Sequence, residues 1–68
     1  MDRNHFLKLA QKFSEGKQVT VLFDGTEYFP AAYKMDFCNG TPKNRAILMD
    51  QNKNSIIEVA MEKVGECE

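Results

Sequence analysis

The sequence predicts a mainly β fold with one helix, an α+β domain in which an N-terminal α-helix precedes four or five short antiparallel strands. Apolar residues recur at helical spacing as far as Gly16 and alternate with a period of two after it. Turn-forming residues then divide the remainder into short apolar runs. A chain of 68 residues has room for one core. We therefore predict a single domain, 1–68, with the helix in 1–16 and an antiparallel sheet or barrel in 17–68.

Residues 3–15 are predicted to be helical because they place one apolar stripe along a helix. The residues of this stripe are Phe6, Leu9, Ala10 and Phe13. Asp2 or Asn4 can accept hydrogen bonds from the free amides of the first turn, and Gly16 can adopt the left-handed conformation that ends a helix. The stripe is expected to pack on the sheet.

A tight hairpin is predicted after the helix. Residues 19–23 alternate in polarity and lead into Asp24-Gly25, a dipeptide that favours a type I′ turn. The returning strand, 28–37, is rich in aromatic residues, and Phe29, Tyr33 and Phe37 share one parity, so one of its faces is expected to be apolar. Pro30 cannot donate a ladder hydrogen bond and indicates an edge, a bulge or a sharp bend.

The C-terminal half is predicted to contain two further strands and a short tail. Residues 38–44 are predicted to form a loop because turn formers are concentrated there. Residues 45–50 form a central strand that is apolar at both parities, and 51–54 form a polar turn. Residues 55–61 return as the fourth strand, and 62–68 form a brief turn with a last edge strand or a frayed tail.

Several segments resemble the strands of Sm-like proteins, and the order of elements resembles small SH3-like and Sm-like barrels across residues 17–64. The segments that carry the resemblance are V-T-V-L-F-D-G-T-E-Y, A-I-L-M-D and S-I-I-E-V-A-M-E-K-V. The resemblance implies a small barrel and an RNA site, but the chain departs from the family at motif positions. These departures are Phe29-Pro30 in place of a glycine, the closer spacing of Asp36 and Asn39, and Lys63-Val64-Gly65 in the last loop. The chain also resembles short uncharacterised proteins of phages and mobile elements of Gram-positive bacteria.

Charge and composition argue against several classes of function. Nine Lys and Arg residues against ten Asp and Glu residues do not form the broad basic surface of a dedicated nucleic-acid binder. The single histidine, His5, lies in the first turn of the predicted helix, away from any evident nucleophile. We therefore predict no enzyme activity, no catalytic residues, no metal site and no cofactor.

The expected compartment is the cytoplasm. No secretory signal or run of about 18 apolar residues is evident, so no membrane partner is expected. In that reducing compartment Cys38 and Cys67 are expected to remain free thiols.

The leading functional hypothesis is a small interaction or regulatory module, an accessory protein of a phage or mobile element. Tyr28 and Tyr33 have opposite parity, so at least one is expected to face outward as an anchor for a protein partner. Ile56 and Glu58 lie on the second face of a fourth strand with few residues that would block edge pairing. A protein partner or self-association is therefore expected, with a homodimer or small ring favoured over a monomer.

The alternative hypothesis is a nucleic-acid or nucleotide binder on an Sm-like barrel. Its candidate residues are Lys43, Asn44, Arg45 and Lys53, which combine positive charge with an amide donor. A strand separates Lys43 from Lys53, so the two loops are expected at opposite ends of the sheet.

Overall fold

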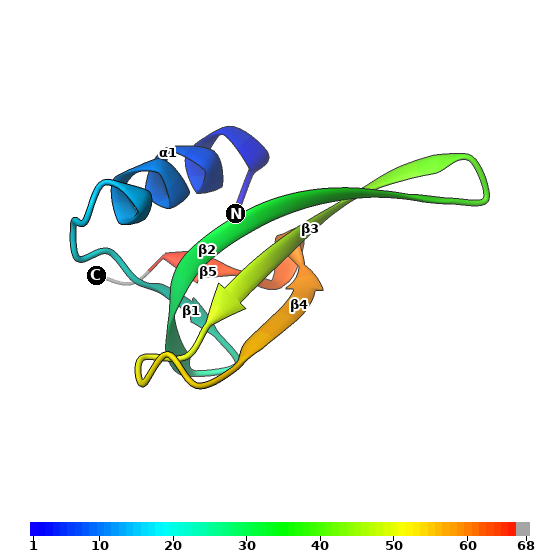
Figure 1. The fold of residues 1–68 in the computed structure, drawn as a ribbon. Coiled ribbons are helices and arrows are strands. Elements are labelled where there is room, and N and C mark those ends of the chain that lie inside the picture. Colours follow the sequence, from blue (N-terminus) through cyan, green and yellow to red (C-terminus); the bar gives the residue numbers. More distant parts are fainter. Residues whose placement is uncertain (67–68) are drawn as a thin grey trace.

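A computed structural model describes residues 1–66 and contains one helix and five strands that form an antiparallel sheet (Figure 1). The elements are α1 (Arg3–Ser14), β1 (Val21–Phe23), β2 (Thr26–Cys38), β3 (Thr41–Met49), β4 (Ile56–Ala60), the 3₁₀ helix η1 (Met61–Lys63) and β5 (Gly65–Glu66). The strand order is β4-β3-β2-β1-β5. The predicted mainly β, α+β fold is therefore confirmed. Within residues 1–66 the sheet is not closed, since β4 and β5 form its two edges.

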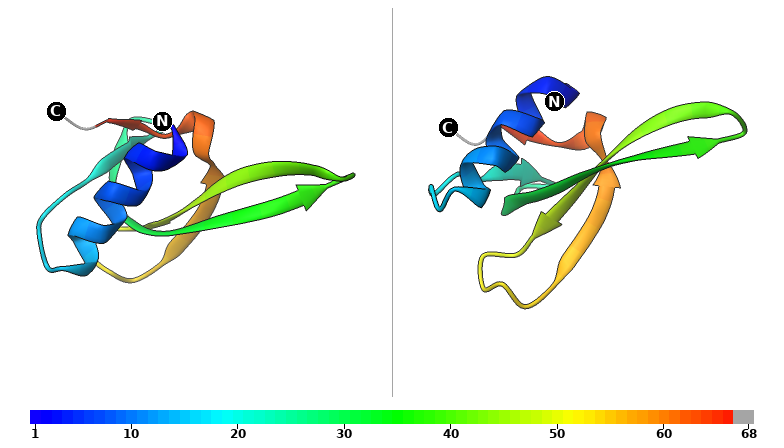
Figure 2. Two further views of the ribbon diagram at one scale, coloured as in Figure 1. Left: turned by 90° about the horizontal axis from the view of Figure 1, so that it is seen from above. Right: turned by 45° about the horizontal axis from the view of Figure 1, so that its top comes forward.

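The helix begins and ends as its sequence predicts. The Asp2 side chain accepts a hydrogen bond from the His5 backbone amide at 2.8 Å, and Gly16 has a φ of +90° just beyond the last turn. Phe6 is fully buried, and Phe13 stacks on Phe29 of β2 with ring centroids 5.0 Å apart. The apolar stripe thus fixes α1 across β2 (Figure 2).

The Asp24-Gly25 turn is of the predicted type, with φ values of +52° and +76°. The strand before it is shorter than predicted. Only Val21–Phe23 pair with β2, and of these Val21 and Leu22 also pair with β5. Residues 17–20 connect the helix to β1 without pairing.

The predicted loop at 38–44 is wrong, because these residues belong to a long β2–β3 hairpin. Asn39 and Gly40 alone make the turn, with φ values of +53° and +79°, and pairing resumes at once between Cys38 and Thr41. A type I′ turn needs only two residues with positive φ, which Asn and Gly supply. The third strand therefore starts at Thr41 instead of residue 45, and the hairpin projects from the body (Figures 1 and 2).

Pro30 lies beside a bulge, one of the alternatives that its sequence position indicated. Pro30 pairs with Leu48 and Ala32 pairs with Ile47, which leaves Ala31 without a partner in β3. The extra residue reverses the alternation of side chains along β2. The prediction that the aromatic residues of β2 share one face is therefore wrong, because Phe29 and Tyr33 lie on opposite faces of the sheet.

The core combines Phe6 of α1 with residues from one face of the sheet, from η1 and from the residue that follows η1. Its buried residues are Phe6, Val21, Ala46, Leu48, Val59, Met61 and Val64. Val64 connects η1 to β5, and its carbonyl accepts a hydrogen bond from the Met1 nitrogen at 2.9 Å. The predicted turn and last edge strand are confirmed as far as Glu66. Residues 67–68, which include the predicted free thiol of Cys67, lie outside the described residues.

We predict that Phe6→Ala lowers the free energy of unfolding by about 3–5 kcal/mol, because it removes a fully buried ring from the middle of a small core. Chemical denaturation monitored by circular dichroism measures this change. Leu7→Ala is the matched control on the same turn: Leu7 is 40% exposed, and its loss should cost about 0.5 kcal/mol or less. Equal losses for the two variants would contradict the docking of α1.

Candidate interaction surface

The β2–β3–β4 part of the sheet has a core face, which α1 partly covers, and an outer face. The strand register assigns cross-strand neighbours to each face, because directly paired residues point to the same side. Tyr33, Ala46 and Val59 form one row of the core face, and Lys34, Arg45 and Ala60 form the adjacent row of the outer face.

The two tyrosines predicted as alternative anchors both lie on the core face. Tyr28 precedes the bulge and Tyr33 follows it, so the reversed alternation cancels their difference in parity. Both pack against the core and both are partly buried. The prediction that at least one of them faces outward is therefore wrong, since it assumed an unbroken strand.

Tyr33 is also engaged by a residue that was predicted to bind nucleic acid. Its hydroxyl donates a hydrogen bond to Oδ1 of Asn44 at 2.6 Å across the β2–β3 hairpin. The Tyr33 hydroxyl donor and the Asn44 Oδ1 acceptor are thus already occupied by each other and are not free to bind a ligand.

An ion cluster of Lys34, Asp36, Arg45 and Glu58 spans three strands of the outer face. Glu58 on β4 accepts from Lys34 Nζ at 3.3 Å and from Arg45 Nε at 3.2 Å, and Lys34 Nζ lies 3.5 Å from Asp36 Oδ1. The hydrogen bond from Lys34 lowers the pKa of the Glu58 carboxyl, and the bond from Arg45 acts in the same direction. The same bond to Glu58 raises the pKa of Lys34, with a further contribution from the charge of Asp36.

The four residues predicted to bind nucleic acid do not form one patch. Arg45 is bound to Glu58, whereas Lys43 lies on the projecting hairpin. Lys53 lies in the β3–β4 turn at the other end of β3, with its Nζ 6.0 Å from the centroid of the Phe29 ring. Lys43 and Lys53 therefore lie toward opposite ends of β3, but Lys43 belongs to the strand itself and not to the predicted loop.

The most exposed apolar surface among the described residues lies on the β2–β3 hairpin and was not predicted from the sequence. Phe37 is 72% exposed and Met35 is 39% exposed. Both lie on the core face beyond the reach of α1, and Pro42 is paired with Phe37. We call Met35, Phe37 and Pro42 the hairpin strip. The alternation K-M-D-F at 34–37 was a visible signal for it, but the loop predicted at 38–44 concealed the length of the hairpin.

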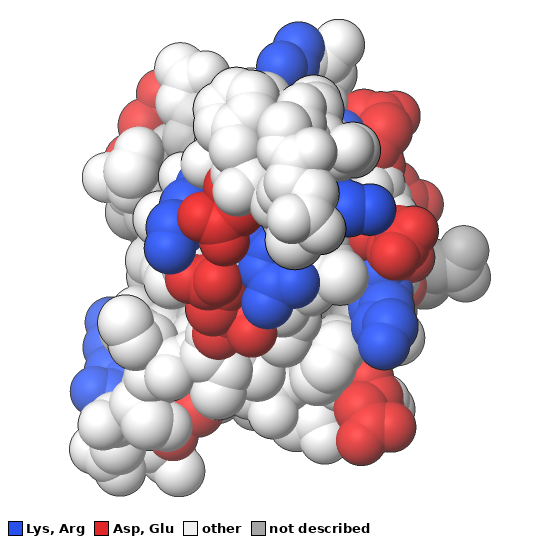
Figure 3. All heavy atoms as spheres, turned by 90° about the vertical axis from the view of Figure 1, so that its right-hand side faces the viewer, with Lys and Arg blue, Asp and Glu red and all other residues white. Residues whose placement is uncertain are grey.

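Charge is segregated between the two faces of this hairpin. Tyr33, Asn44 and the strip are uncharged, and Lys34, Asp36, Lys43 and Arg45 lie on the outer face. Viewed end-on, the molecule shows an uncharged tip above interleaved basic and acidic groups (Figure 3). The hairpin is therefore an amphipathic ribbon.

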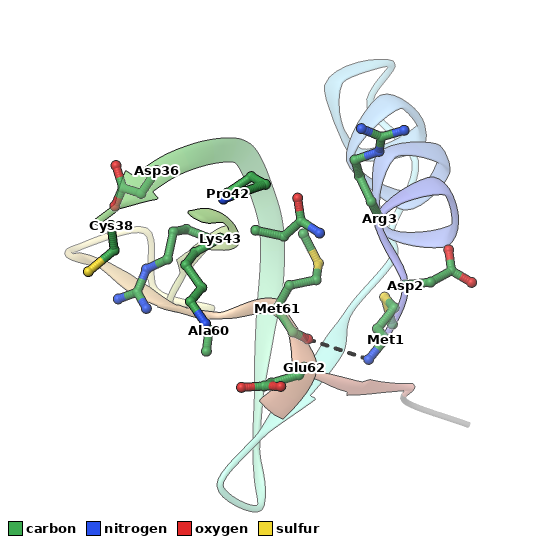
Figure 4. A pocket seen from close by; sticks show the side chains of 12 residues that line it. Met1, Asp2, Arg3, Asp36, Cys38, Pro42, Lys43, Ala60, Met61 and Glu62 are labelled. Carbon is green, nitrogen blue, oxygen red and sulfur yellow. Dashed lines mark hydrogen bonds between the residues drawn. The ribbon is translucent and has the colours of Figure 1, made fainter. Parts of the chain in front are cut away.

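An open pocket of about 630 Å³ lies between the hairpin and the start of α1 (Figure 4). Apolar side chains, among them Met1 and Met61, form part of its lining. Its charged residues are Arg3, Lys43 and Arg45 on the basic side and Asp2, Asp36 and Glu62 on the acidic side. The charges of these six side chains balance, and the Met1 ammonium is already held by the Met61 and Val64 carbonyls. Within residues 1–66 no group of His, Cys, Asp or Glu is placed to hold a metal ion. The pocket therefore does not select a strongly charged small ligand.

Comparison of the chain with protein-family models, curated proteins and solved structures finds no match. Between residues 1 and 66, no helix has the length and apolar character needed to cross a membrane. The inference of function therefore depends on the surface geometry.

We predict that Lys34→Gln raises the pKa of the Glu58 carboxyl toward its ordinary value, because the variant loses the cation and the charge-assisted hydrogen bond that favour the ionised form. NMR titration of the Glu58 side-chain carbon measures the midpoint. Because the folded-state pKa of Glu58 is lowered, the stability that it contributes is present above the unfolded pKa and is lost as pH falls through the folded pKa. Lys53→Gln serves as the control and should leave the midpoint unchanged; an unchanged midpoint in Lys34→Gln would show that this ion pair does not form in solution.

Proposed function

We propose that this protein is a non-catalytic interaction module that binds a protein partner through the hairpin strip. The observation that carries the proposal is the 72% exposure of Phe37 on a preformed ribbon that extends beyond the body of the domain. An accessory role in a phage or mobile element is the setting that the resemblance implies.

The exposed ring of Phe37 leaves apolar area in contact with water. Full burial of a Phe side chain contributes about 1.5–3 kcal/mol. Met35 and Pro42 enlarge the same surface, and the paired strands hold all three residues in place before binding. A partner therefore meets a surface that needs little ordering, which reduces the entropic cost of association.

Charge favours a protein partner over nucleic acid. A nucleic-acid site needs unpaired cations beside its stacking aromatic residues. Here Lys34 and Arg45 already bind Glu58, and the net formal charge is −1. The alternative of an RNA or nucleotide binder rests on Lys43, which lies on the same hairpin as Phe37 but on its other face.

We expect Phe37→Ser to weaken binding of a peptide or protein selected on the wild-type domain by about 30-fold or more, as for an aromatic anchor at the centre of an interface. Selection from a peptide-display library followed by fluorescence-anisotropy titration supplies the ligand and the measurement. Lys53→Ser, at the far end of the sheet, is the control and should bind as wild type does. Equal affinities for the Phe37→Ser variant and wild type would refute the hairpin strip as the binding surface.

The nucleic-acid alternative is tested by titration of single-stranded RNA at two salt concentrations. We expect no binding that depends on Lys43 and Arg45. Affinity that falls as salt rises and disappears in a Lys43→Gln, Arg45→Gln variant would replace the present proposal with the alternative.

A further inference from the structure

We infer that β4 is the self-association edge of this domain and pairs antiparallel with β4 of a second copy about a two-fold axis at Glu58. This inference goes beyond the binding of a partner at the hairpin strip, because it concerns another surface and another occupant. It follows from the direction of the backbone groups of β4, from its side chains and from its local charge.

The phase of the backbone hydrogen bonds in the sheet follows from the Asn39-Gly40 turn. In a two-residue hairpin, the residues that flank the turn exchange hydrogen bonds, and the pattern alternates from there. Thr41 and every second residue after it therefore direct their backbone groups toward β2, and Pro42, Asn44, Ala46 and Leu48 direct theirs toward the β4 side. Pro42 is paired with Phe37 and Pro30 with Leu48, both at positions where β2 and β3 do not exchange hydrogen bonds. Proline, which has no N–H, is tolerated there.

The same alternation identifies the free groups of β4. Val59 is paired with Ala46 and Ile57 with Leu48, so Ile57 and Val59 direct their N–H and C=O groups toward β3. Ile56, Glu58 and Ala60 direct theirs away from the sheet. β4 is an edge of the sheet, and no other strand of the described chain lies on that side.

This edge lacks the features that usually prevent pairing between molecules. Natural edge strands are protected by lysine, proline, a bulge or short length. The free part of β3 carries Pro42 and Lys43, and β5 is only two residues long. β4 is five residues long, has a regular register and contains neither Lys nor Pro. Of these three strands, β4 is therefore the one best suited to accept another strand.

The spacing of the free groups fits a second copy of the same strand. With Glu58 on the two-fold axis, Ile56 lies opposite Ala60 of the partner subunit, and every outward N–H faces an outward C=O. Ile56 is 65% exposed, and the small Ala60 leaves room for it in the other chain. Pairing thus satisfies the edge and buries the exposed isoleucine together.

The charges of the outer face are self-complementary. Glu58 alone would oppose such pairing, because the axis brings it next to Glu58 of the partner subunit. In each copy, however, Lys34 and Arg45 hold that carboxylate at 3.3 and 3.2 Å, and the cluster with Asp36 has no net charge. A neutral cluster does not repel its own copy, and it does not attract a strongly acidic or basic partner.

The decisive measurement is amide hydrogen exchange at low and high protein concentration. We expect the N–H groups of Ile56, Glu58 and Ala60 to become protected only at high concentration, while those of Ile57 and Val59 are protected at both because they bind β3. Sedimentation over the same range should show the mass of the chain rising to twice its value. A monomer at all concentrations, or an unchanged exchange pattern across β4, would overturn the inference.

Two variants test the edge from different directions. Ile56→Lys adds a charge to it, and Ala60→Pro removes one outward N–H from a residue whose φ of −67° already suits proline. Each should raise the dimer dissociation constant about tenfold or more, with an unfolding midpoint close to that of the wild-type monomer.

Phe37→Lys is the control, because its site lies on the hairpin strip, and the dimer should persist in it. Dissociation by Phe37→Lys with no effect of Ile56→Lys would place self-association on the hairpin and overturn the inference. Loss of peptide binding in Phe37→Ser with an intact dimer would support both assignments. An intact dimer whose Phe37→Ser variant still binds the peptide would refute the hairpin site alone.

Discussion

The bulge at Ala31 is the constraint on which the surfaces of this domain depend. Without the extra residue, the alternation set by Pro30 and Leu48 would continue unchanged along β2, and Lys34 and Asp36 would replace Tyr33 and Met35 on the core face. Burial of such charges without partners is costly. The bulge instead places Tyr33, Met35 and Phe37 on the core face, and it places Lys34 where it meets Glu58. Pro30 occupies the position beside the bulge where no N–H is needed.

The bulge therefore separates apolar side chains from charged ones, which produces two surfaces of different chemistry. On the core face, apolar residues continue past the end of α1 and become the hairpin strip. On the outer face, the ion pairs join β2, β3 and β4 in one cluster around Glu58. These pairs are exposed and are screened by salt, so they contribute little to the stability of the fold. Their main consequence is that they hold the charged side chains in fixed positions on the outer face. In the proposed dimer, the positive charges of Lys34 and Arg45 offset the charge of the Glu58 carboxylate and so allow β4 to approach a second copy.

Local signals in the sequence were sufficient for the helix, the Asp24-Gly25 turn and the fold class. The same type of signal was present at Asn39-Gly40, but other turn formers surround it, and their number concealed a two-residue turn within a long hairpin. The sites were harder to predict because Tyr28 and Tyr33, which have opposite parity, lie on the same face when one residue between them bulges, and parity alone does not show a bulge. The contacts of Glu58 with Lys34 and Arg45 cross strands that are distant in sequence, so they follow only from the register. For Ile56 and Glu58, the sequence pattern showed that the two side chains share a face. The direction of their backbone N–H and C=O groups could be derived only from the register of the β2–β3 hairpin.

A small core explains why such surfaces remain exposed. Seven buried apolar residues and one helix of twelve residues cover only part of one face of the sheet. The rest of the sheet must be polar, protected or bound. Ion pairs lie on the outer face, and Pro42 and Lys43 protect the free part of β3. Within residues 1–66, no strand pairs with the outer edge of β4, and the hairpin strip is exposed. Pairing at β4 extends the sheet sideways, whereas the hairpin strip lies on the core face beyond α1. A dimer formed through β4 therefore presents two copies of the hairpin strip. A partner with repeated binding segments then gains from effective concentration, because its second segment binds within the same complex.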